Sequence, residues 1–283
     1  MASQILFENP PSPYIRGLEV TVIVGGLAMG LMEFMGVHLK YSKFNVGSSS
    51  SAQLPSRMGM FIFYAPAFLV AAFFLFCKLE WESASFLLEK LGLLQLCIRL
   101  QLLEKAGPRF LVLSLAVALH FLKRLIEVLF VHRYSGGIAI DTTIITTSLY
   151  ALYSANVLYA MQISEGLRPP SIDLMPLGIF LFIVGMSGNL YHHHLLSTLR
   201  KEGEKGYQIP HGGLFDLVVC PHYFFEVIDF VGMAFISQIP VAFCAAFMVF
   251  CYLLGRSLST KSWYLKKFES FPSNRKALIP FLI

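Results

Sequence analysis

The sequence predicts an all-α integral membrane protein with about seven transmembrane helices. Of its 283 residues, 56% are hydrophobic and only 14% are charged, whereas a soluble domain carries about 25% charged residues. So few charges cannot cover a water-exposed surface of this size, and the mean hydropathy of +0.65 agrees. This composition excludes an extended soluble enzyme, a disordered chain and a disulfide scaffold.

Apolar stretches of about 19 residues, the length of a membrane-crossing helix, recur along the chain. We expect spans near 18–37, 58–78, 110–131, 142–163, 175–199, 214–236 and 237–255. The sixth span is unusually polar and is expected to be tilted or half-buried. Because the N-terminal residues lack the features of a cleaved signal peptide, the first span is expected to direct insertion.

Residues 79–109 are too charged to span a membrane. Their apolar residues recur at helical spacing, which predicts an amphipathic helix lying on the membrane surface. These apolar residues are Leu87, Leu91, Leu94, Ile98 and Leu102.

Basic residues predict the orientation. They gather in the 38–57 connection, in residues 200–211 and in the tail after Leu254. Seven spans place all three segments on one side, and Lys and Arg collect in cytoplasmic loops. We therefore expect a cytosolic C-terminus and a lumenal N-terminus. The net charge of +5 is too small to imply a nucleic-acid partner.

The five cysteines include no C-x-x-C pair and are expected to be small buried hydrophobic residues.

Three predicted spans carry stripes of polar residues at helical spacing. The stripes are His120, Lys123, Arg124 and Glu127 in the third span, Asn189, His193, Ser197 and Arg200 in the fifth, and His222, Glu226 and Asp229 in the sixth. Ionisable groups inside a membrane are costly, so the stripes are expected to face one another around a polar cavity open to the cytosolic side. They could instead only pair and hold the helices together. The surplus of cationic and histidine side chains favours a polyanionic ligand such as a nucleotide diphosphate.

The run Tyr191–His194 does not predict a metal site. Neighbouring helical residues point about 100° apart, so three consecutive histidines cannot share one metal ion. His193 is expected to be the cavity-facing residue of the run. Farther along, a proline and two glycines in 206–226 precede a helix, which suits close approach of backbone to a ligand or an ordinary interfacial turn. No G-x-G-x-x-G follows a strand, so a Rossmann cofactor site is not indicated.

Several segments resemble signatures of the steroid 5α-reductase family, which includes steroid, polyprenol and very-long-chain enoyl-CoA reductases. They are FLFIVGMSGN (180–189), YQIPHGGLF (207–215), CPHYFFEVIDFVG (220–232) and YLKKFESFPSNRKALIPFLI (264–283). LPSRMGMFIFYAPAF (54–68) resembles the segment that carries a catalytic Gln-Glu pair, and LHFLKRLIEVLFVHRYSGG (119–137) is similar to the enoyl-CoA reductase branch.

The resemblance implies an NADPH-dependent oxidoreductase of the endoplasmic reticulum membrane, acting in steroid biosynthesis and lipid metabolism. It divides the chain into N-terminal transmembrane helices with the interfacial segment (1–109) and a C-terminal cofactor-binding region (110–283). By motif matching, the cofactor-binding residues would be Arg124, Asn189, His193, Arg200, Tyr207, His222, Glu226 and Tyr264. His193 stands where the family often has Asp, and His222 where it often has Asn.

The catalytic residues depart further from the family. Tyr64 occupies the position of the glutamate and Phe63 that of the glutamine, while Phe121 and Phe225 replace tyrosines of the steroid and enoyl-CoA branches. The family reaction places negative charge on a carbonyl oxygen, where a phenol can donate a hydrogen bond. We therefore expect Tyr64, with Tyr223 as second candidate, to be the catalytic donor. Tyr64 could otherwise be an ordinary interfacial aromatic residue.

These features predict hydride transfer from NADPH to the β-carbon of a 3-oxo-4-ene steroid, which reduces its 4,5 double bond. The alternative is a trans-2-enoyl-CoA reductase of very-long-chain fatty acid elongation, which the 119–137 block favours. The expected partners are a hydrophobic small molecule, steroid or acyl-CoA, and membrane lipid, with no nucleic acid. A prenylcysteine-type methyltransferase, a transporter or scaffold, and an inactive family member remain open.

Overall fold

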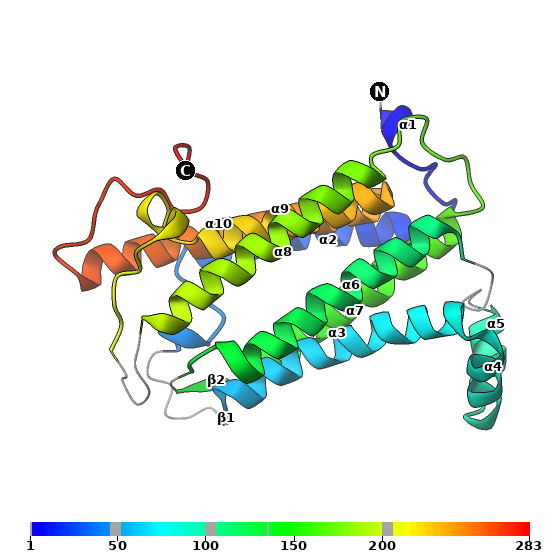
Figure 1. The fold of residues 1–283 in the computed structure, drawn as a ribbon, viewed down its shortest axis with the longest axis horizontal. Helices are drawn as coiled ribbons and strands as arrows, with labels where there is room; N and C mark the ends of the chain where they lie inside the picture. The colour runs from blue at the N-terminus through cyan, green and yellow to red at the C-terminus, as the bar shows by residue number, and fades with distance from the viewer. Residues whose placement is uncertain (1, 46–51, 100–105, 135, 200–205) are drawn as a thin grey trace.

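Long helices that run side by side dominate the computed structural model, which describes residues 2–45, 52–99, 106–134, 136–199 and 206–283 (Figure 1). The long helices are α2 (Pro13–Phe34), α3 (Ser56–Leu79), α6 (Pro108–Ile126), α7 (Ile140–Ser164), α8 (Met175–Thr198), α9 (Pro221–Ser237) and α10 (Pro240–Lys267). They form two layers, α2 with α8, α9 and α10, and α3 with α6 and α7. Packing of α6 against α9 joins the layers.

Short elements connect these helices. They are α1 (Ala2–Ile5), the 3₁₀ helix η1 (Ser42–Phe44), β1 (Gln53–Pro55), α4 (Trp81–Lys90), α5 (Leu94–Arg99), the π-helix η2 (Glu127–Val131), β2 (Gly137–Ala139) and the 3₁₀ helix η3 (Gly213–Asp216). β1 and β2 pair antiparallel with Leu54 opposite Ile138, which ties the start of α3 to the start of α7.

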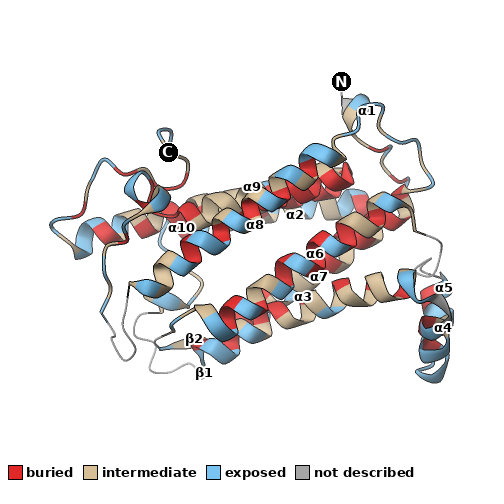
Figure 2. Ribbon diagram, in the orientation of Figure 1, coloured by how far each residue is buried: buried red, intermediate tan, exposed pale blue. Residues whose placement is uncertain are grey.

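Each long helix overlaps one predicted span, but within the described residues only four are long and apolar enough to cross a membrane. These four are α2, α3, α8 and α10. The structure is thus a mostly helical protein with membrane-spanning character, and the full count of seven spans stays a prediction. Exposed residues extend along the lengths of the helices (Figure 2), and large apolar side chains such as Val24, Leu31 and Phe130 are among them, as lipid contact requires.

The structure corrects the start of the sixth span and the single helix predicted over 79–109. The sixth span, expected to begin at 214, begins as a helix only at Pro221, because Val219 and Cys220 donate backbone hydrogen bonds to the C-terminal tail. In place of one amphipathic helix over 79–109, the described part forms two helices, α4 and α5, that lie across the end of α3 (Figure 1). Gly92, with φ at +67°, lies between the two helices and separates them, since helical residues have negative φ. Residues 100–105 lie outside the described residues.

Small residues allow the close helix packing that brings the polar stripes of α8 and α9 together. A Cβ atom at Gly185 would lie 2.5 Å from the backbone nitrogen of Asp229, and one at Gly232 would lie 2.5 Å from that of Phe182. Glycine is therefore required at both contacts, in the way that small residues are typical of membrane helix interfaces.

The described parts of the three basic segments lie at the same end of the bundle, as expected, while α1, α4 and α5 lie at the other (Figure 1). At the basic end the tail docks on the segment before α9, where the Val219 N–H donates to the Lys276 carbonyl over 2.8 Å. The five cysteines are free thiols; Cys77, Cys97 and Cys220 are buried as predicted, whereas Cys244 and Cys251 are only half-buried.

Candidate active site

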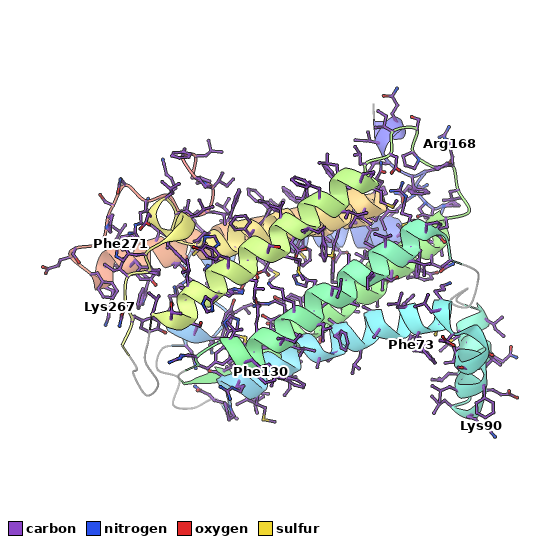
Figure 3. All side chains as sticks on the ribbon, in the orientation of Figure 1. Phe73, Lys90, Phe130, Arg168, Lys267 and Phe271 are labelled. Carbon is purple, nitrogen blue, oxygen red and sulfur yellow. The ribbon has the colours of Figure 1, made fainter. Side chains whose placement is uncertain are left out.

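A cavity of about 250 Å³ lies between the two layers and reaches the basic end of the bundle. Every long helix contributes to its wall, for example through Met29, Tyr64, Arg124, Tyr150, His193, Glu226 and Tyr252. Loop residues at the basic end complete it, among them Ser42, Lys43, Arg133 and Tyr207. Side chains from both layers fill most of the remaining space between the helices (Figure 3).

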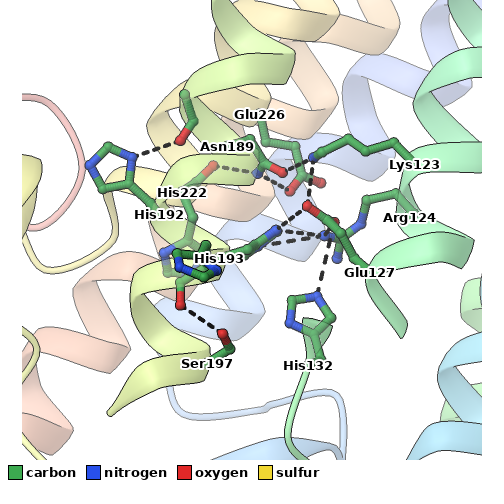
Figure 4. A network of polar contacts seen from close by, with 12 residues as sticks. Lys123, Arg124, Glu127, His132, Asn189, His192, His193, Ser197, His222 and Glu226 are labelled. Atoms are coloured by element: carbon green, nitrogen blue, oxygen red, sulfur yellow. Dashed lines mark hydrogen bonds and ion pairs between the residues drawn. The ribbon is translucent and has the colours of Figure 1, made fainter. Parts of the chain in front are cut away.

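Glu127 is the centre of the polar network beside this cavity (Figure 4). Its buried carboxylate lies 3.2 Å from Nζ of Lys123, 2.7 Å from Nη1 of Arg124 and 3.1 Å from Nδ1 of His193. One carboxylate thus accepts from two cations of its own helix and also contacts α8. The predicted stripes of the third and fifth spans do face each other.

A π-turn brings His132 below this carboxylate. The His132 N–H donates to the Glu127 carbonyl over 2.8 Å, five residues back, where α6 ends in the π-helix η2. Such turns are frequent at functional sites because they re-aim the side chains around them. Nε2 of His132 comes within 4.0 Å of the Glu127 carboxylate. Burial beside His193 and Arg124 lowers the pKa of His132 to about 2, so its imidazole is neutral.

Asn189 joins the stripe of α8 to those of α6 and α9. Its amide donates to the His222 carbonyl over 2.8 Å, and its side-chain oxygen accepts from Lys123. The amide also lies 3.5 Å from the Glu226 carboxylate. Asn189 therefore lies behind the cavity wall and holds Lys123 and the first turn of α9 in position.

The stripes both line the cavity and pair with each other. His120 and Asp229 form a buried pair away from the wall, as the pairing interpretation would require. Arg124, His193, His222 and Glu226 line the cavity. Ser197, expected in the stripe of the fifth span, is half-buried and donates to the His194 carbonyl, away from Glu127.

The structure brings most predicted site residues to one cavity. Its wall includes Tyr64, Tyr223, Arg124, His193, Tyr207, His222 and Glu226. Tyr264 is buried just outside the wall, stacked on Phe271 with Lys43 over its ring. Arg200 lies outside the described residues.

Tyr64 is held by a hydrogen bond and by ring stacking, and its helical turn is attached to α7. Its hydroxyl accepts a hydrogen bond from Nη2 of Arg124 over 2.7 Å, and its ring stacks on Tyr150 with centroids 5.4 Å apart. Two residues on, Pro66 leaves the Ile62 carbonyl without its helical donor. The Thr147 hydroxyl replaces that donor over 3.2 Å and so attaches this turn of α3 to α7.

Sequence reasoning missed a buried ion pair at the cavity. The sequence predicts that Arg256 belongs to the cytosolic tail, but it lies inside α10, pairs with Glu33 of α2 over 3.0 Å and lines the cavity. The rings of Tyr41 and Phe44 sandwich its guanidinium, at 4.3 and 4.1 Å. The signal was available, since Glu33 is an acidic residue well inside a predicted span.

The chemical groups of the cavity wall suit a dinucleotide. Arg124 and Arg256 supply positive charge for a diphosphate, and aromatic side chains supply flat apolar walls. Nδ1 of His222 is buried without a hydrogen-bond partner among the described residues, as expected of a wall group that binds a polar ligand.

Glu127, His132 and His193 are close enough to hold a metal ion, with ligand atoms within 4.8 Å of one another. The charges oppose this, because Lys123 and Arg124 already neutralise the carboxylate. Nη1 of Arg124 also lies 3.0 Å from Nδ1 of His193, where a metal cation would be repelled. That the chain binds no metal stays a prediction.

Comparison with known proteins agrees with the motifs. The sequence model of the family described as 3-oxo-5-alpha-steroid 4-dehydrogenase matches residues 142–283. The chain is 30% identical to 3-oxo-5-alpha-steroid 4-dehydrogenase 2 of Homo sapiens over 276 residues, which cover 96% of this chain and 97% of the relative.

Other relatives match over a shorter stretch. The chain is 43% identical to 3-oxo-5-alpha-steroid 4-dehydrogenase 1 of Homo sapiens over 106 residues, 38% of this chain and 41% of the relative. It is 42% identical to the steroid 5-alpha-reductase DET2 of Gossypium hirsutum over 106 residues, 37% of this chain and 41% of the relative. The match thus spans about two-fifths of the length of these two relatives. From the match along nearly the whole chain, we conclude that this protein belongs to the 3-oxo-5-alpha-steroid 4-dehydrogenase family.

Proposed function

We propose that the chain is an NADPH-dependent reductase that saturates the 4,5 double bond of a 3-oxo-4-ene steroid. The names of its relatives support a steroid substrate. The observation that carries the proposal is the position of the Tyr64 hydroxyl, on a cavity wall that combines cationic and histidine side chains with apolar ones.

Bound NADPH would supply a hydride to the β-carbon of the enone. The residues proposed to hold it are Arg124, His193, Tyr207, His222 and Glu226 at the wall, Asn189 and Tyr264 behind it, and Arg200. Among these, Arg124, His193 and His222 suit phosphate and ribose oxygens because they donate hydrogen bonds.

Tyr64 would donate a hydrogen bond to the C3 carbonyl oxygen, where negative charge develops as the β-carbon accepts hydride. The resulting enolate would then take a proton at C4, ultimately from solvent, to give the saturated ketone. A donor placed at that oxygen stabilises the transition state more than the ground state and so accelerates the step. Phe63, Phe230 and Met248 provide apolar walls for a flat hydrocarbon body and would keep water from the reacting atoms. Tyr223, also in the wall, is the second candidate donor.

The test is turnover by microsomes that contain the full chain, incubated with NADPH and either a 3-oxo-4-ene steroid or a long-chain trans-2-enoyl-CoA. We expect NADPH loss and a saturated product with the steroid only. Consumption of only the acyl-CoA would establish the alternative reductase. Turnover of neither would reject both, and binding of S-adenosylmethionine in place of NADPH would indicate a methyltransferase.

We also propose that the protein resides in the endoplasmic reticulum membrane with its C-terminus in the cytosol. The grouping of the basic segments at one end of the bundle supports this orientation. A C-terminal epitope should be cleaved by protease in intact microsomes; protection of the epitope until detergent is added would reverse the assignment.

A further inference from the structure

We propose that Arg124 is a positioning residue for the phenol of Tyr64, directing its hydrogen into the cavity and stabilising charge on its oxygen. The proposal rests on the proposed function, because it concerns the donor to the steroid carbonyl. It gives Arg124 a second role, in addition to the contact with the cofactor proposed above.

The direction of the hydrogen bond follows from the chemistry of the two groups. A guanidinium has only donors, so Nη2 of Arg124, 2.7 Å away, must donate to the Tyr64 oxygen. The hydroxyl hydrogen takes no part in this bond, and no other side-chain hydrogen bond to Tyr64 occurs within the described ranges. Because Tyr64 lines the cavity, the hydrogen is available to a ligand there.

The guanidinium also changes the strength of the donor. When the phenol donates to an oxygen that is gaining negative charge, its own oxygen becomes more negative. Arg124 lies next to that oxygen, and its charged carbon is 4.8 Å from the centre of the Tyr64 ring. A fixed positive charge in a buried site stabilises this charge without reorganisation.

The surroundings fix the direction of the guanidinium. Nη1 is held 2.7 Å from Glu127 and lies 3.0 Å from Nδ1 of His193, so Nη2 of the same planar group is the one aimed at Tyr64. A single ammonium has no such planar fork. The neighbouring cation, Lys123, cannot replace it, since its ammonium is held by Glu127 and Asn189.

The test uses the purified full chain with NADP⁺ bound and a 3-oxo-4-ene steroid added. A hydrogen bond to the carbonyl oxygen shifts the ultraviolet absorption of an enone to longer wavelength, so the shift reports the donor without turnover. We expect the wild-type shift to be lost in Tyr64→Phe and clearly reduced in Arg124→Gln. The exposed Arg168→Gln, which removes a surface cation paired with Glu8 over 3.6 Å, should keep it.

Kinetics supply the second readout. Arg124→Gln should lower kcat about 10- to 100-fold, within the range for loss of transition-state stabilisation, with a smaller change in KM for NADPH. In the Tyr64→Phe background, Arg124→Gln should lower kcat by less than about 3-fold, since the effects of residues that act as a unit are not additive.

Three results would overturn the proposal: an unchanged shift in Arg124→Gln, additive losses in the double variant, or a loss confined to KM for NADPH. If Arg124→Gln does not fold, Arg124→Lys decides, and an unchanged shift there overturns it as well. Absence of steroid binding by the folded wild-type chain would instead reject the proposed function, and this inference with it.

Discussion

Nδ1 of His120 on α6 lies 2.5 Å from a carboxylate oxygen of Asp229 on α9, and both side chains are almost completely buried. On α6, Lys123 and Arg124 lie about one helical turn after His120. On α9, Glu226 lies about one turn before Asp229. The pair therefore sets the register of α6 against α9, and with it the positions of the cavity residues that these two helices carry.

Asp229→Ala should strongly destabilise the fold. It leaves the His120 imidazole buried without its partner, which costs about 3–5 kcal/mol of unfolding free energy. Asp229→Asn should cost less, because the amide oxygen can still accept from Nδ1 of His120. Thermal unfolding in detergent measures both, with the exposed Glu8→Gln as control. Equal losses in the two Asp229 variants would contradict a specific hydrogen-bonded pair.

Gly213→Ala should disturb the turn that leads from the PHGG segment into η3. Gly213 has φ at +53°, and a Cβ atom there would lie 2.8 Å from Nε2 of His192. That nitrogen accepts from the Leu214 N–H over 3.1 Å, so the substitution displaces a hydrogen-bond partner as well as straining the backbone. We expect a loss of about 1–3 kcal/mol in unfolding free energy.

Gly166→Ala is the matched control for this substitution, because nothing lies within 4 Å of its Cβ position. It should leave the unfolding temperature unchanged. If both alanine variants lower the unfolding temperature equally, the close contact with His192 is not the cause.

Arg275→Ala should loosen the C-terminal tail. The buried guanidinium donates to the Pro210 carbonyl over 2.7 Å and lies over the Phe271 ring. A lost hydrogen bond to a charged group costs about 1.5–3 kcal/mol. Limited proteolysis should then cleave the tail faster than in wild type, whereas the exposed Lys267→Ala should not change the rate. Equal cleavage rates in Arg275→Ala and wild type would show that backbone bonds alone hold the tail.

Asp173 should contribute stability that is lost in acid. The Met175 N–H, 3.0 Å away, and the Arg109 guanidinium, 2.6 Å away, hold the pKa of its carboxyl below the ordinary 3.8. A lowered folded-state pKa means that the carboxylate stabilises the fold above the unfolded pKa, and that this stability disappears as pH falls through the folded value. Because Asp173 is largely exposed, the effect should be small.

Unfolding temperatures of wild type and Asp173→Asn, measured from neutral pH to below pH 3.8, test this expectation. Their difference should be present near neutrality and shrink as the pH falls. A difference that stays constant over the whole range would mean that the carboxylate charge contributes nothing.

Sequence periodicity predicted the helices and the polar stripes well, because both depend on residues three or four positions apart. The same reasoning placed His193, and not its two histidine neighbours, on the cavity side, where it lies. Local signals failed where a distant segment decides the outcome. The α9 boundary depends on backbone bonds to Lys276 and Ala277, and the role of Arg256 depends on Glu33, 223 positions away.

By itself, the sequence determined that the chain is helical, membrane-embedded and a member of its family, because composition, helical spacing and contiguous motifs are local properties. Only the tertiary structure decided which stripe residues pair and which face the cavity. It also placed Arg124 against Tyr64, 60 positions earlier. Such contacts arise when separate helices pack, since close packing and the need to satisfy every buried charge select one arrangement from many that the same local pattern permits.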